Sequence, residues 1–568
     1  MKTFKAPERG LQRGRMRCWW EDAHRSCRRQ RLWWRRGVVV WCVLSVCCVP
    51  VLSSAPASRA RQRLAQQSAP TGSRPPALPA SVTERVLALS LENAIQLALQ
   101  NNLDIERGRL DPQVQHTLVE QARAVFDPTV ELTANLSQTK TLPQNKTAVF
   151  DPDTGLPTGA FVITRPFSKD VAVTPGFKQQ IVTGANYELR FINTWNKAAP
   201  ARSGETSRIE NPRYQGSLTL TFTQPLLRNF GIAVNTAPIR QAQHAEEIAR
   251  QQLLQTILNT VYAVQQGYWE LVFRIQDLGV KREAQKLAED FLAENKLRVD
   301  LGALAPVELV QSETQVKQRE GDVITAEAAV REAEDVLKET LNIPESMGTW
   351  RIRVLPTDTP PFVPMADISV DEKVAFALQH RPDVAQAQLT VASQEIARDA
   401  ASNQRLPQLD LGGAASVSGF GGNFGSSTAD IGTADGYNWG VSLTFTYPLG
   451  NRAANNGLQQ QNLLLQQARI DQRKVQRTVS RQIFQTVRNL ETASKRVEVT
   501  RAATVLARTQ LEAEQEKFRL GLSTSFNVLQ LQNQLTAARS DEIRALSDYN
   551  EALGQLDQVT GAIQYAIK

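Results

Sequence analysis

Apolar residues recur at alternating intervals of four and three along a very long stretch of the chain, residues 235–301. They occupy Leu253, Ile257, Val261, Val264, Tyr268, Leu271, Ile275 and Leu278. This spacing predicts a helix with a coiled-coil seam, and about 67 residues with a rise of 1.5 Å each would extend roughly 100 Å. Residues 453–520 form a second such stretch, in which Gly457 is the one helix breaker. Ordinary helices average about three turns, so neither stretch fits inside a single globular core.

Shorter helices are predicted over residues 91–124, 306–341, 370–403 and 525–554 or beyond. Pro112 is expected to kink or split the first of them and Pro382 to interrupt the third, because proline lacks the backbone N–H and its ring collides with the preceding turn. In each half of the chain, two short helices laid end to end are about as long as one long helix. The pattern therefore indicates long rods that are each flanked by shorter helices in series.

Between the first short helix and the long helix of each half, the apolar period changes from helical spacing to two. Apolar side chains alternate with Thr, Ser and Asn over residues 130–136, 217–223 and 441–447, and a shorter match opens at Leu409 and Leu411. Alternation of this kind is typical of strands with lipid on one side and water on the other. A strand packed on an ordinary core would alternate in the same way. The alternation predicts four core strands.

The two halves of the chain are copies of one plan. Residues 89–105 (LSLENAIQLALQNNLDI) return at 368–384 (ISVDEKVAFALQHRPDV), and LTFTQPL at 220–226 returns as LTFTYPL at 443–449. A Leu-Gly turn at Leu301 returns at Leu520. The predicted organisation is a signal peptide (1–60), a flexible linker (61–86), a first repeat (87–345, strands and loop about 126–224), an inter-repeat linker (346–366), a second repeat (367–563, strands about 406–448) and a C-terminal tail (564–568).

Differences in spacing show where the two repeats diverge. The offset between equivalent residues is 279 at the first helix, 223 at the strand motif and 219 at the turn. The first repeat therefore carries 279 − 223 = 56 extra residues between its strands, around residues 140–211, which we expect to form a long extracellular loop with a hairpin of its own near 180–195. A further 223 − 219 = 4 residues precede the turn, either as a stutter in the coiled coil or as slack at the strand exit.

The net charge of +8 comes from the N-terminus. Residues 1–60 contain 13 of the 65 basic and 3 of the 57 acidic residues, which leaves 52 − 54 = −2 for the rest, so nucleic-acid binding loses its main support. Five arginines precede an apolar run at 38–55 and small residues follow it, the layout of a secretory signal peptide. A membrane anchor is the alternative, although Pro50 interrupts the run. All five cysteines precede residue 49, so the mature chain has no disulfides.

No stretch after the leader approaches the roughly 18 apolar residues of a membrane helix, so a mature protein that crosses a membrane must do so with strands. Four strands cannot close a membrane barrel, for which about eight are needed. The chain must then oligomerise, with each copy giving a share of the barrel and of a helical tube. Aromatic residues near strand ends could form a membrane girdle or anchor loops: Trp195, Tyr214, Tyr437 and Trp439.

The repeated helix start, the strand-Pro-Leu exits at Pro225 and Pro448 and the Leu-Gly turns at Gly302 and Gly521 together resemble the TolC-like outer-membrane efflux proteins, the outer membrane factors. The resemblance implies a mostly α fold with a membrane β-barrel portion: a trimeric 12-stranded barrel in the outer membrane of a Gram-negative bacterium and a long α-helical periplasmic tunnel. It also implies a homotrimer in outer-membrane lipid whose partners are a periplasmic adaptor (membrane fusion) protein and an inner-membrane pump.

In the family, the adaptor docks at the helix-turn-helix tips, which narrow the tunnel. The matching tip residues here are Leu301, Gly302, Ala303, Leu304, Leu520, Gly521, Leu522 and Ser523. The matching aperture residues are Glu308, Gln311, Phe518, Asn527 and Gln530. Three copies of Glu308 would form a carboxylate ring that favours cations. Glu308 also suits a purely structural role near a helix N-terminus, two residues after Pro306.

Sites for covalent or metal chemistry are missing from the sequence. The four histidines (His24, His116, His244 and His380) are scattered, and neither a nucleotide-binding loop nor a paired-carboxylate arrangement occurs. The sequence thus predicts no cofactor and no enzyme activity, and favours a passive exit duct for efflux or type I secretion of small molecules or proteins. The alternatives are a periplasmic coiled-coil adaptor or scaffold without a pore, and an exported enzyme on a helical scaffold.

Overall fold

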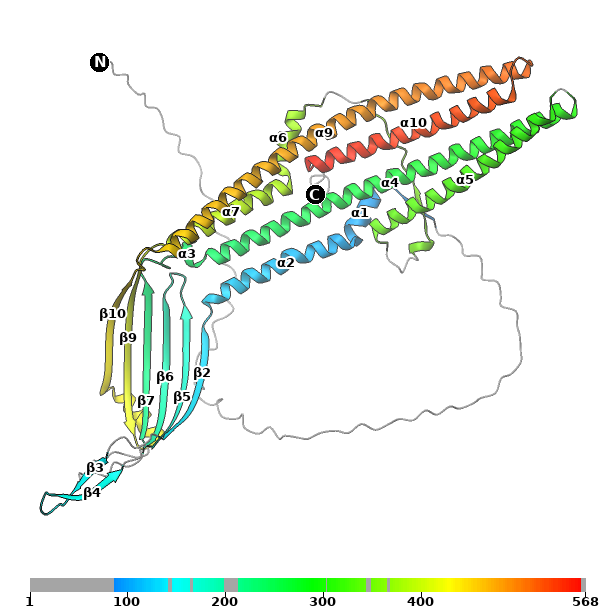
Figure 1. Cartoon of the computed structure of the whole chain (residues 1–568). Coiled ribbons are helices and arrows are strands. Elements are labelled where there is room, and N and C mark those ends of the chain that lie inside the picture. The colour runs from blue at the N-terminus through cyan, green and yellow to red at the C-terminus, as the bar shows by residue number, and fades with distance from the viewer. Residues whose placement is uncertain are drawn as a thin grey trace, which may run out of the picture. The chain divides into compact units, whose positions relative to one another are not determined.

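The computed structural model describes residues 86–140, 146–163, 167–198, 213–302, 304–343, 349–364 and 368–562. The predicted signal peptide, the linker up to residue 85 and the tail 564–568 lie outside this part. In it, long helices run alongside one another and lead at one end into a sheet (Figure 1). The predicted fold class, mostly α with a separate sheet portion and a duplicated plan, is confirmed.

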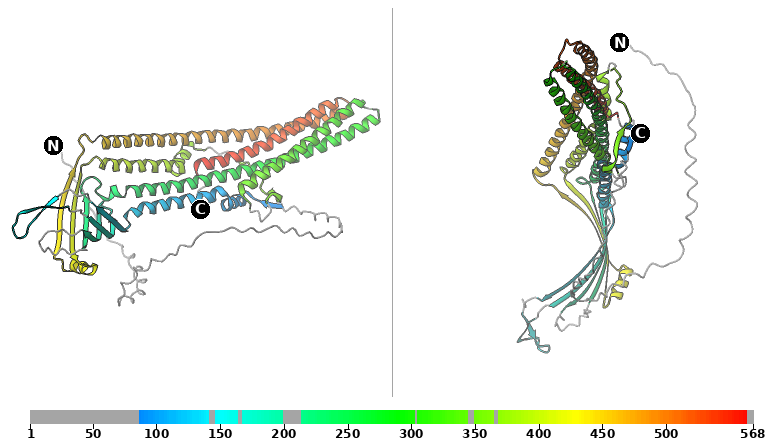
Figure 2. Two further views of the ribbon diagram at one scale, coloured as in Figure 1. Left: turned by 60° about the horizontal axis from the view of Figure 1, so that its bottom comes forward. Right: turned by 90° about the vertical axis from the view of Figure 1, so that its right-hand side faces the viewer.

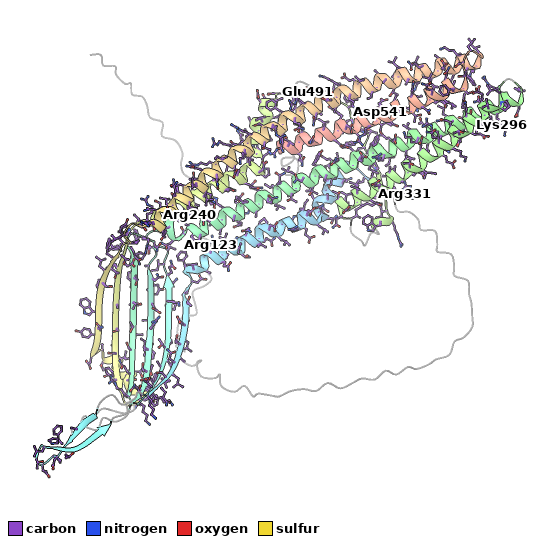
Figure 3. All side chains as sticks on the ribbon, viewed as in Figure 1. Arg123, Arg240, Lys296, Arg331, Glu491 and Asp541 are labelled. Carbon is purple, nitrogen blue, oxygen red and sulfur yellow. The ribbon has the colours of Figure 1, made fainter. Side chains whose placement is uncertain are left out.

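The long helices are α4 (Ala237–Asp300) and α9 (Arg452–Arg519), as the apolar periods predicted. Each turns back into a shorter helix, α5 (Pro306–Leu341) or α10 (Ser525–Thr560), and so forms a helical hairpin. Charged side chains are distributed along these helices, from Arg240 near the sheet to Lys296 near the far end (Figure 3). Among the described residues, no helix combines the length and the hydropathy that crossing a membrane requires.

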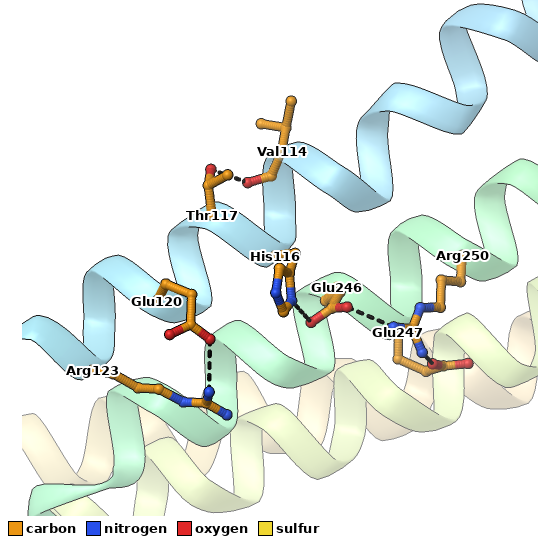
Figure 4. Close-up of polar contacts among 8 residues, drawn as sticks. All are labelled: Val114, His116, Thr117, Glu120, Arg123, Glu246, Glu247 and Arg250. Carbon is orange, nitrogen blue, oxygen red and sulfur yellow. Dashed lines mark hydrogen bonds and ion pairs between the residues drawn. The ribbon is translucent and has the colours of Figure 1, made fainter. Parts of the chain in front are cut away.

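Two pairs of shorter helices flank the halves of α4 and α9 next to the sheet. They are α1 (Leu91–Asn101) with α2 (Leu103–Arg123), and α6 (Val370–His380) with α7 (Pro382–Asn403). α2 runs along α4, where His116 and Glu246 are 3.4 Å apart (Figure 4). A short 3-10 turn, Ala124–Phe126, joins α2 to the sheet.

The predicted split at Pro112 does not occur, because the chain breaks at Asn102 instead. The Asn102 side chain accepts hydrogen bonds from the backbone N–H groups of Asp104 and Ile105 and thereby caps α2. Pro112 lies inside α2, which continues through it to Arg123. The predicted interruption at Pro382 is confirmed, since Pro382 is the first residue of α7.

The four additional residues of the first repeat lie at the strand exit and do not form a stutter. Between Pro225 and the start of α4 the chain has 11 residues, which include the short helix α3 (Ile232–Asn235), whereas 3 residues separate Pro448 from α9. α4 has 64 residues and α9 has 68, so the net difference is (11 − 3) − (68 − 64) = 4. The first repeat therefore carries its extra residues in the segment between the sheet and α4.

The main sheet contains six strands, where the sequence predicted four. Its order is β10-β9-β7-β6-β5-β2, and every neighbouring pair is antiparallel. The strands are β2 (Thr129–Lys140), β5 (Phe167–Gln180), β6 (Asn186–Ala198), β7 (Arg213–Pro225), β9 (Gln408–Gly421) and β10 (Gly436–Thr446). The 56 extra residues thus do more than form a loop, because part of them adds the hairpin β5–β6 to the sheet.

Alternation places the apolar side chains of this sheet on one face. In one row across it, Val130, Phe177, Leu189, Leu220, Ala415 and Trp439 are successive register partners. Val130 is 79% exposed and Trp439 is 71% exposed. The opposite face carries Thr, Ser, Asn and charged side chains. The sheet of a single chain therefore leaves a broad apolar face uncovered.

Two smaller elements lie beyond the sheet at the end away from the helices. The strands β3 (Lys146–Phe150) and β4 (Pro157–Ile163) form a separate hairpin, and the short helix α8 (Phe424–Thr433), which the sequence did not predict, packs on β7 and β9 (Figure 2). Glycine permits this packing, because a Cβ added at Gly216 would come within 2.8 Å of Ile431 Cδ1, and one at Gly419 within 2.4 Å of the Ser427 carbonyl.

The largest cores lie midway along the helical hairpins. In the first repeat, the parallel strands β1 (Val86–Leu89) and β8 (Arg353–Pro356) pack on α4 around Tyr268, which is fully buried and whose hydroxyl bonds Leu89 O and Asp358. In the second repeat, Tyr549 donates to the Val363 carbonyl at 2.7 Å. Tyr268 thus joins the segment that enters the first repeat to a helical hairpin. Tyr549 does the same for the segment that links the two repeats.

Candidate functional site: the paired helical tips

The turn of each helical hairpin is built around a glycine with a positive φ angle, +72° at Gly302 and +76° at Gly521. This backbone conformation favours glycine because other residues suffer a clash of Cβ with the backbone. In the second tip, the N–H of Leu522 donates to Lys517 O and the N–H of Gly521 to Phe518 O, which satisfies the last carbonyls of α9. The second turn is therefore closed by its own backbone hydrogen bonds.

The predicted adaptor-contact residues lie in these turns. Leu301, Leu520 and Leu522 are 74%, 66% and 75% exposed, Gly302 and Gly521 are also exposed, and Leu304 is half-buried. Ala303 lies outside the described residues. Exposed leucines gathered on short turns are unusual for a surface in water and are characteristic of contact sites.

Ser523, the last of the predicted tip residues, is hydrogen-bonded within its own hairpin. Its hydroxyl donates to Glu514 Oε1, and it accepts from Asn527 Nδ2 at 3.3 Å. The Ser523 hydrogen bond, followed by that of Lys517, lowers the pKa of Glu514. Asn527, an aperture candidate, is exposed and belongs to the same small network.

Gln311 and Gln530, two further aperture candidates, are brought together by the fold. They line a groove of about 530 Å³ between α5 and α10 of one chain. The rest of the lining mixes apolar and amide side chains: Val307, Val310, Thr314, Gln315, Phe526, Leu529 and Asn533. Gln315 donates to Asn533 Oδ1 at 2.9 Å and so bridges the two helices at the groove.

Phe518 does not lie at a surface in the single chain. Its ring is 4% exposed and packs 5.4 Å from the ring of Phe291, with the Arg298 guanidinium 4.6 Å from its centroid. Arg298 also donates to the Phe518 carbonyl. The ring therefore fastens α9 to α4 below the tips, and its part in an aperture remains a prediction for the assembled protein.

Glu308 lies in the first turn of α5 and is half-buried. Its Oε2 atom is buried and has no hydrogen-bond partner among the described residues. A carboxylate in the first turn of a helix interacts favourably with the helix dipole, in agreement with the structural role predicted for Glu308. A pore-facing orientation concerns neighbouring copies and remains a prediction.

A buried polar cluster that the sequence did not reveal ties the two tips together. Asn295 on α4 is fully buried and donates to Ser312 Oγ on α5 at 2.8 Å and to Ser525 Oγ on α10 at 3.4 Å. The offset of 219 relates Asn295 to Glu514 and Glu308 to Asn527. Each tip thus has one carboxylate and one amide at these two positions, in opposite order.

Metal sites are not evident in the described residues, which contain no cluster of three or more His, Cys, Asp and Glu side chains able to hold an ion. The tips instead present apolar contacts, amide groups and a groove. Such a surface is suited to binding a protein and lining a passage.

Comparison with known proteins agrees with this arrangement. Residues 375–562 match the family model described as outer membrane efflux protein. No curated protein sequence matches the chain.

Several solved outer membrane channels share the fold. The CmeC channel of Campylobacter jejuni is 15% identical, with a TM-score of 0.57 over 83% of this chain and 85% of its own. VceC of Vibrio cholerae is 14% identical, with a TM-score of 0.57 over 83% of this chain and 96% of its own. The Neisseria gonorrhoeae MtrE channel, solved in its open state, is 13% identical, with a TM-score of 0.55 over 85% of this chain and 93% of its own. The described part of the chain thus has the fold of these outer membrane channels, and its second repeat matches the outer membrane efflux protein model.

Proposed function

We propose that this protein, as a homotrimer, is the passive exit duct of a tripartite efflux or type I secretion system. The six-stranded sheet carries the proposal, because it has one apolar face and one polar face, and because β2 and β10 each have an edge that no other described strand pairs with. Lipid cannot satisfy the free N–H and C=O groups of such edges. Pairing between copies removes the edges and turns the apolar faces toward lipid, while the polar faces enclose water. The number of copies rests on the family.

The helical hairpins continue the wall of the duct into the periplasm. Their length supports a passage that reaches well beyond the membrane, since the 64 residues of α4 extend about 96 Å at 1.5 Å each. In this proposal the energy for transport comes from an inner-membrane pump. The duct itself contributes a route and an entrance that can be narrowed.

The surface of the tips is suited to binding a partner protein at the entrance of the duct. Leu301, Leu520 and Leu522 are exposed, and the groove between α5 and α10 begins beside them. We assign docking of a periplasmic adaptor protein to these turns. Glu308, Gln311, Asn527 and Gln530 then surround the opening, with Glu308 as the charged ring that favours cations.

Conductance tests the proposal. Purified protein in a planar lipid bilayer should form water-filled channels, and unheated samples should migrate on a denaturing gel as an oligomer that boiling converts to a single chain. A periplasmic scaffold without a pore would give neither result, and a carbonate wash would release it from outer membranes. Absence of channels together with release by carbonate would refute the duct.

A further inference from the structure

The hairpin β5–β6 is an integral part of the sheet. β5 pairs with β2 from Thr129–Lys178 to Lys140–Phe167, and β6 pairs with β7 from Asn186–Thr223 to Asn196–Arg213. The two strands have 14 and 13 residues, and about 9–11 residues suffice for a tilted strand to cross a membrane. The hairpin thus separates β2 from β7 along their whole length.

The hairpin shares the apolar face of its neighbours. On this face β5 presents Val171, Val173, Pro175 and Phe177, and β6 presents Tyr187, Leu189, Phe191 and Trp195, with Asn193 as the polar member. Lys169 and Lys197 are register partners at one border of this band, and Gln179 and Tyr187 are partners at the other. The ten steps from Lys169 to Gln179 rise about 33 Å along the strand, or about 25 Å along the membrane normal at a tilt of about 40°, which equals the usual height of a lipid-facing band.

The opposite face of the hairpin is charged. Lys178 and Glu131 are 3.1 Å apart, and Arg190 and Glu188 are 2.5 Å apart. Lys178 and Glu188 are register partners, so the four side chains form one cluster. Such a cluster would be costly in lipid and is suited to a water-filled lumen. A strand pair with lipid on one face and water on the other belongs in the wall of a barrel.

We propose that each copy contributes six strands, so that three copies close a barrel of eighteen strands, with β2 of one copy pairing with β10 of the next. This inference rests on the trimeric duct proposed above. The strand directions permit closure, because the order β10-β9-β7-β6-β5-β2 alternates throughout and leaves β2 and β10 opposite in direction. An even number of strands per copy is required for antiparallel pairing at every seam.

The size of this barrel suits the helices below it. At about 4.8 Å between strands and a tilt of about 40°, eighteen strands have a perimeter of about 113 Å and a backbone diameter of about 36 Å, against about 75 Å and 24 Å for twelve strands. Four helices per chain (α2, α4, α7 and α9) lie next to the sheet (Figure 1), and a ring of three such sets at about 8–10 Å per helix measures about 96–120 Å around. The barrel can therefore join the helical ring with little narrowing and pass bulkier cargo than twelve strands allow.

Single-cysteine labelling tests the inference, since the sequence after residue 48 has no cysteine. Outward sites are V173C and F191C, and inward sites are T174C and I192C. The matched controls on β7 are L220C, outward, and T219C, inward, which lie in the wall whether the barrel has eighteen strands or twelve. In reconstituted trimers, a water-soluble maleimide should label the inward cysteines at least tenfold faster than the outward ones on all three strands.

The outcomes separate this inference from the duct itself. If trimers form and the β7 controls alternate while all hairpin sites label fast, the hairpin lies outside the wall, and the eighteen-stranded barrel is refuted although the duct stands. If no trimer forms and the β7 sites do not alternate, the proposed duct fails and the barrel fails with it. Labelling rates that alternate between inward and outward sites on β5, β6 and β7 support both the duct and the eighteen-stranded barrel.

Discussion

Arg381 holds the C-terminal end of α10 through a 2.9 Å hydrogen bond from its guanidinium to the carbonyl oxygen of Val559. In the first repeat, the amide of Asn102 donates to the carbonyl of Thr340 at 2.8 Å. The offsets of 279 and 219 relate Asn102 to Arg381 and Thr340 to Val559. Two different side chains therefore make the same connection in the two copies of the plan.

Arg381→Ala should destabilise the second repeat by about 2–3 kcal/mol, because the guanidinium also binds both oxygens of Asp383 and the side chain of Gln482. The measurement is the temperature at which the unheated oligomer dissociates on a gel, which should fall. The control is Arg398→Ala, which removes an exposed ion pair with Asp399 and should change stability by less than about 1 kcal/mol. Equal effects of the two variants would contradict a stabilising role of the Arg381 hydrogen bonds.

Gly521→Val should loosen the second tip, since a β-branched residue at a φ of +76° costs of order 1–3 kcal/mol. Hydrogen exchange in the last turn of α9 and the first turn of α10 should accelerate, while the middle of both helices keeps its protection. The control is Gly457→Ala within α9, where a new Cβ meets nothing within 4 Å and which should stabilise the helix by about 0.5–1 kcal/mol. Unchanged exchange at the tip of the Val variant would show that the turn tolerates a side chain.

Stability should decrease as the pH rises from about 4.5 to about 7, because burial raises the pKa of Glu551 from 4.5 to about 7. In this window the folded chain binds a proton that the unfolded chain has lost, so unfolding becomes easier as the pH rises. Arg544 opposes the shift, and Asp548 and Glu270 add to it. Denaturant unfolding of wild-type protein and Glu551→Gln should differ in slope against pH, with the flatter dependence in the variant. A parallel dependence of the two proteins would show that other groups cause it.

Leu522→Asp combined with Leu301→Asp should weaken adaptor binding at least tenfold and leave channel conductance and oligomer stability unchanged. Both side chains are about three-quarters exposed, so the substitutions remove contact area without disturbing a core. Affinity can be measured with the adaptor immobilised. Trp350→Asp, which changes a residue 65% exposed and far from the tips in sequence, is the control. If binding survives the double substitution, adaptor docking uses another surface.

Glu308→Gln should reduce the preference of the channel for cations over anions, seen as a shift of the reversal potential toward zero in a salt gradient. Glu313→Gln, an exposed residue on the same helix, should leave it unchanged. A structural role alone would lower the stability of α5 slightly without any shift in the reversal potential.

The long helices could be predicted because their apolar spacing is regular over many helical turns. The hairpin tips could be predicted because a glycine marks each of them. The sequence pattern does not place the break at Asn102, although Asn followed by Leu-Asp-Ile-Glu is a capping signal, because Pro112 is the more conspicuous helix breaker. The sequence does not reveal the hairpin β5–β6 as part of the sheet, because Pro175 and Gly176 are typical of turns and are disfavoured inside strands. Its place becomes evident only through cross-strand partners such as Trp195 and Tyr214.

At the candidate site, motif spacing located the exposed tips but could not show which side chains are covered. Phe518 was expected at an opening, yet its contact with Phe291 comes from a helix 227 residues earlier in the chain. Asn295 was overlooked because a single amide within a helical pattern looks like surface. Its burial depends on three helices that meet only in the folded hairpins.

The exchange of carboxylate and amide between Asn295–Glu308 and Glu514–Asn527 bears on symmetry. A threefold assembly of a duplicated chain would present six nearly equivalent hairpins around its axis. Asn295 is buried, so the difference lies in the carboxylates: Glu308 is on the second helix of its hairpin and Glu514 is on the first helix of the other. Neighbouring hairpins would therefore carry this charge on different helices. Such an assembly would present three directional pairs of hairpins rather than a sixfold surface.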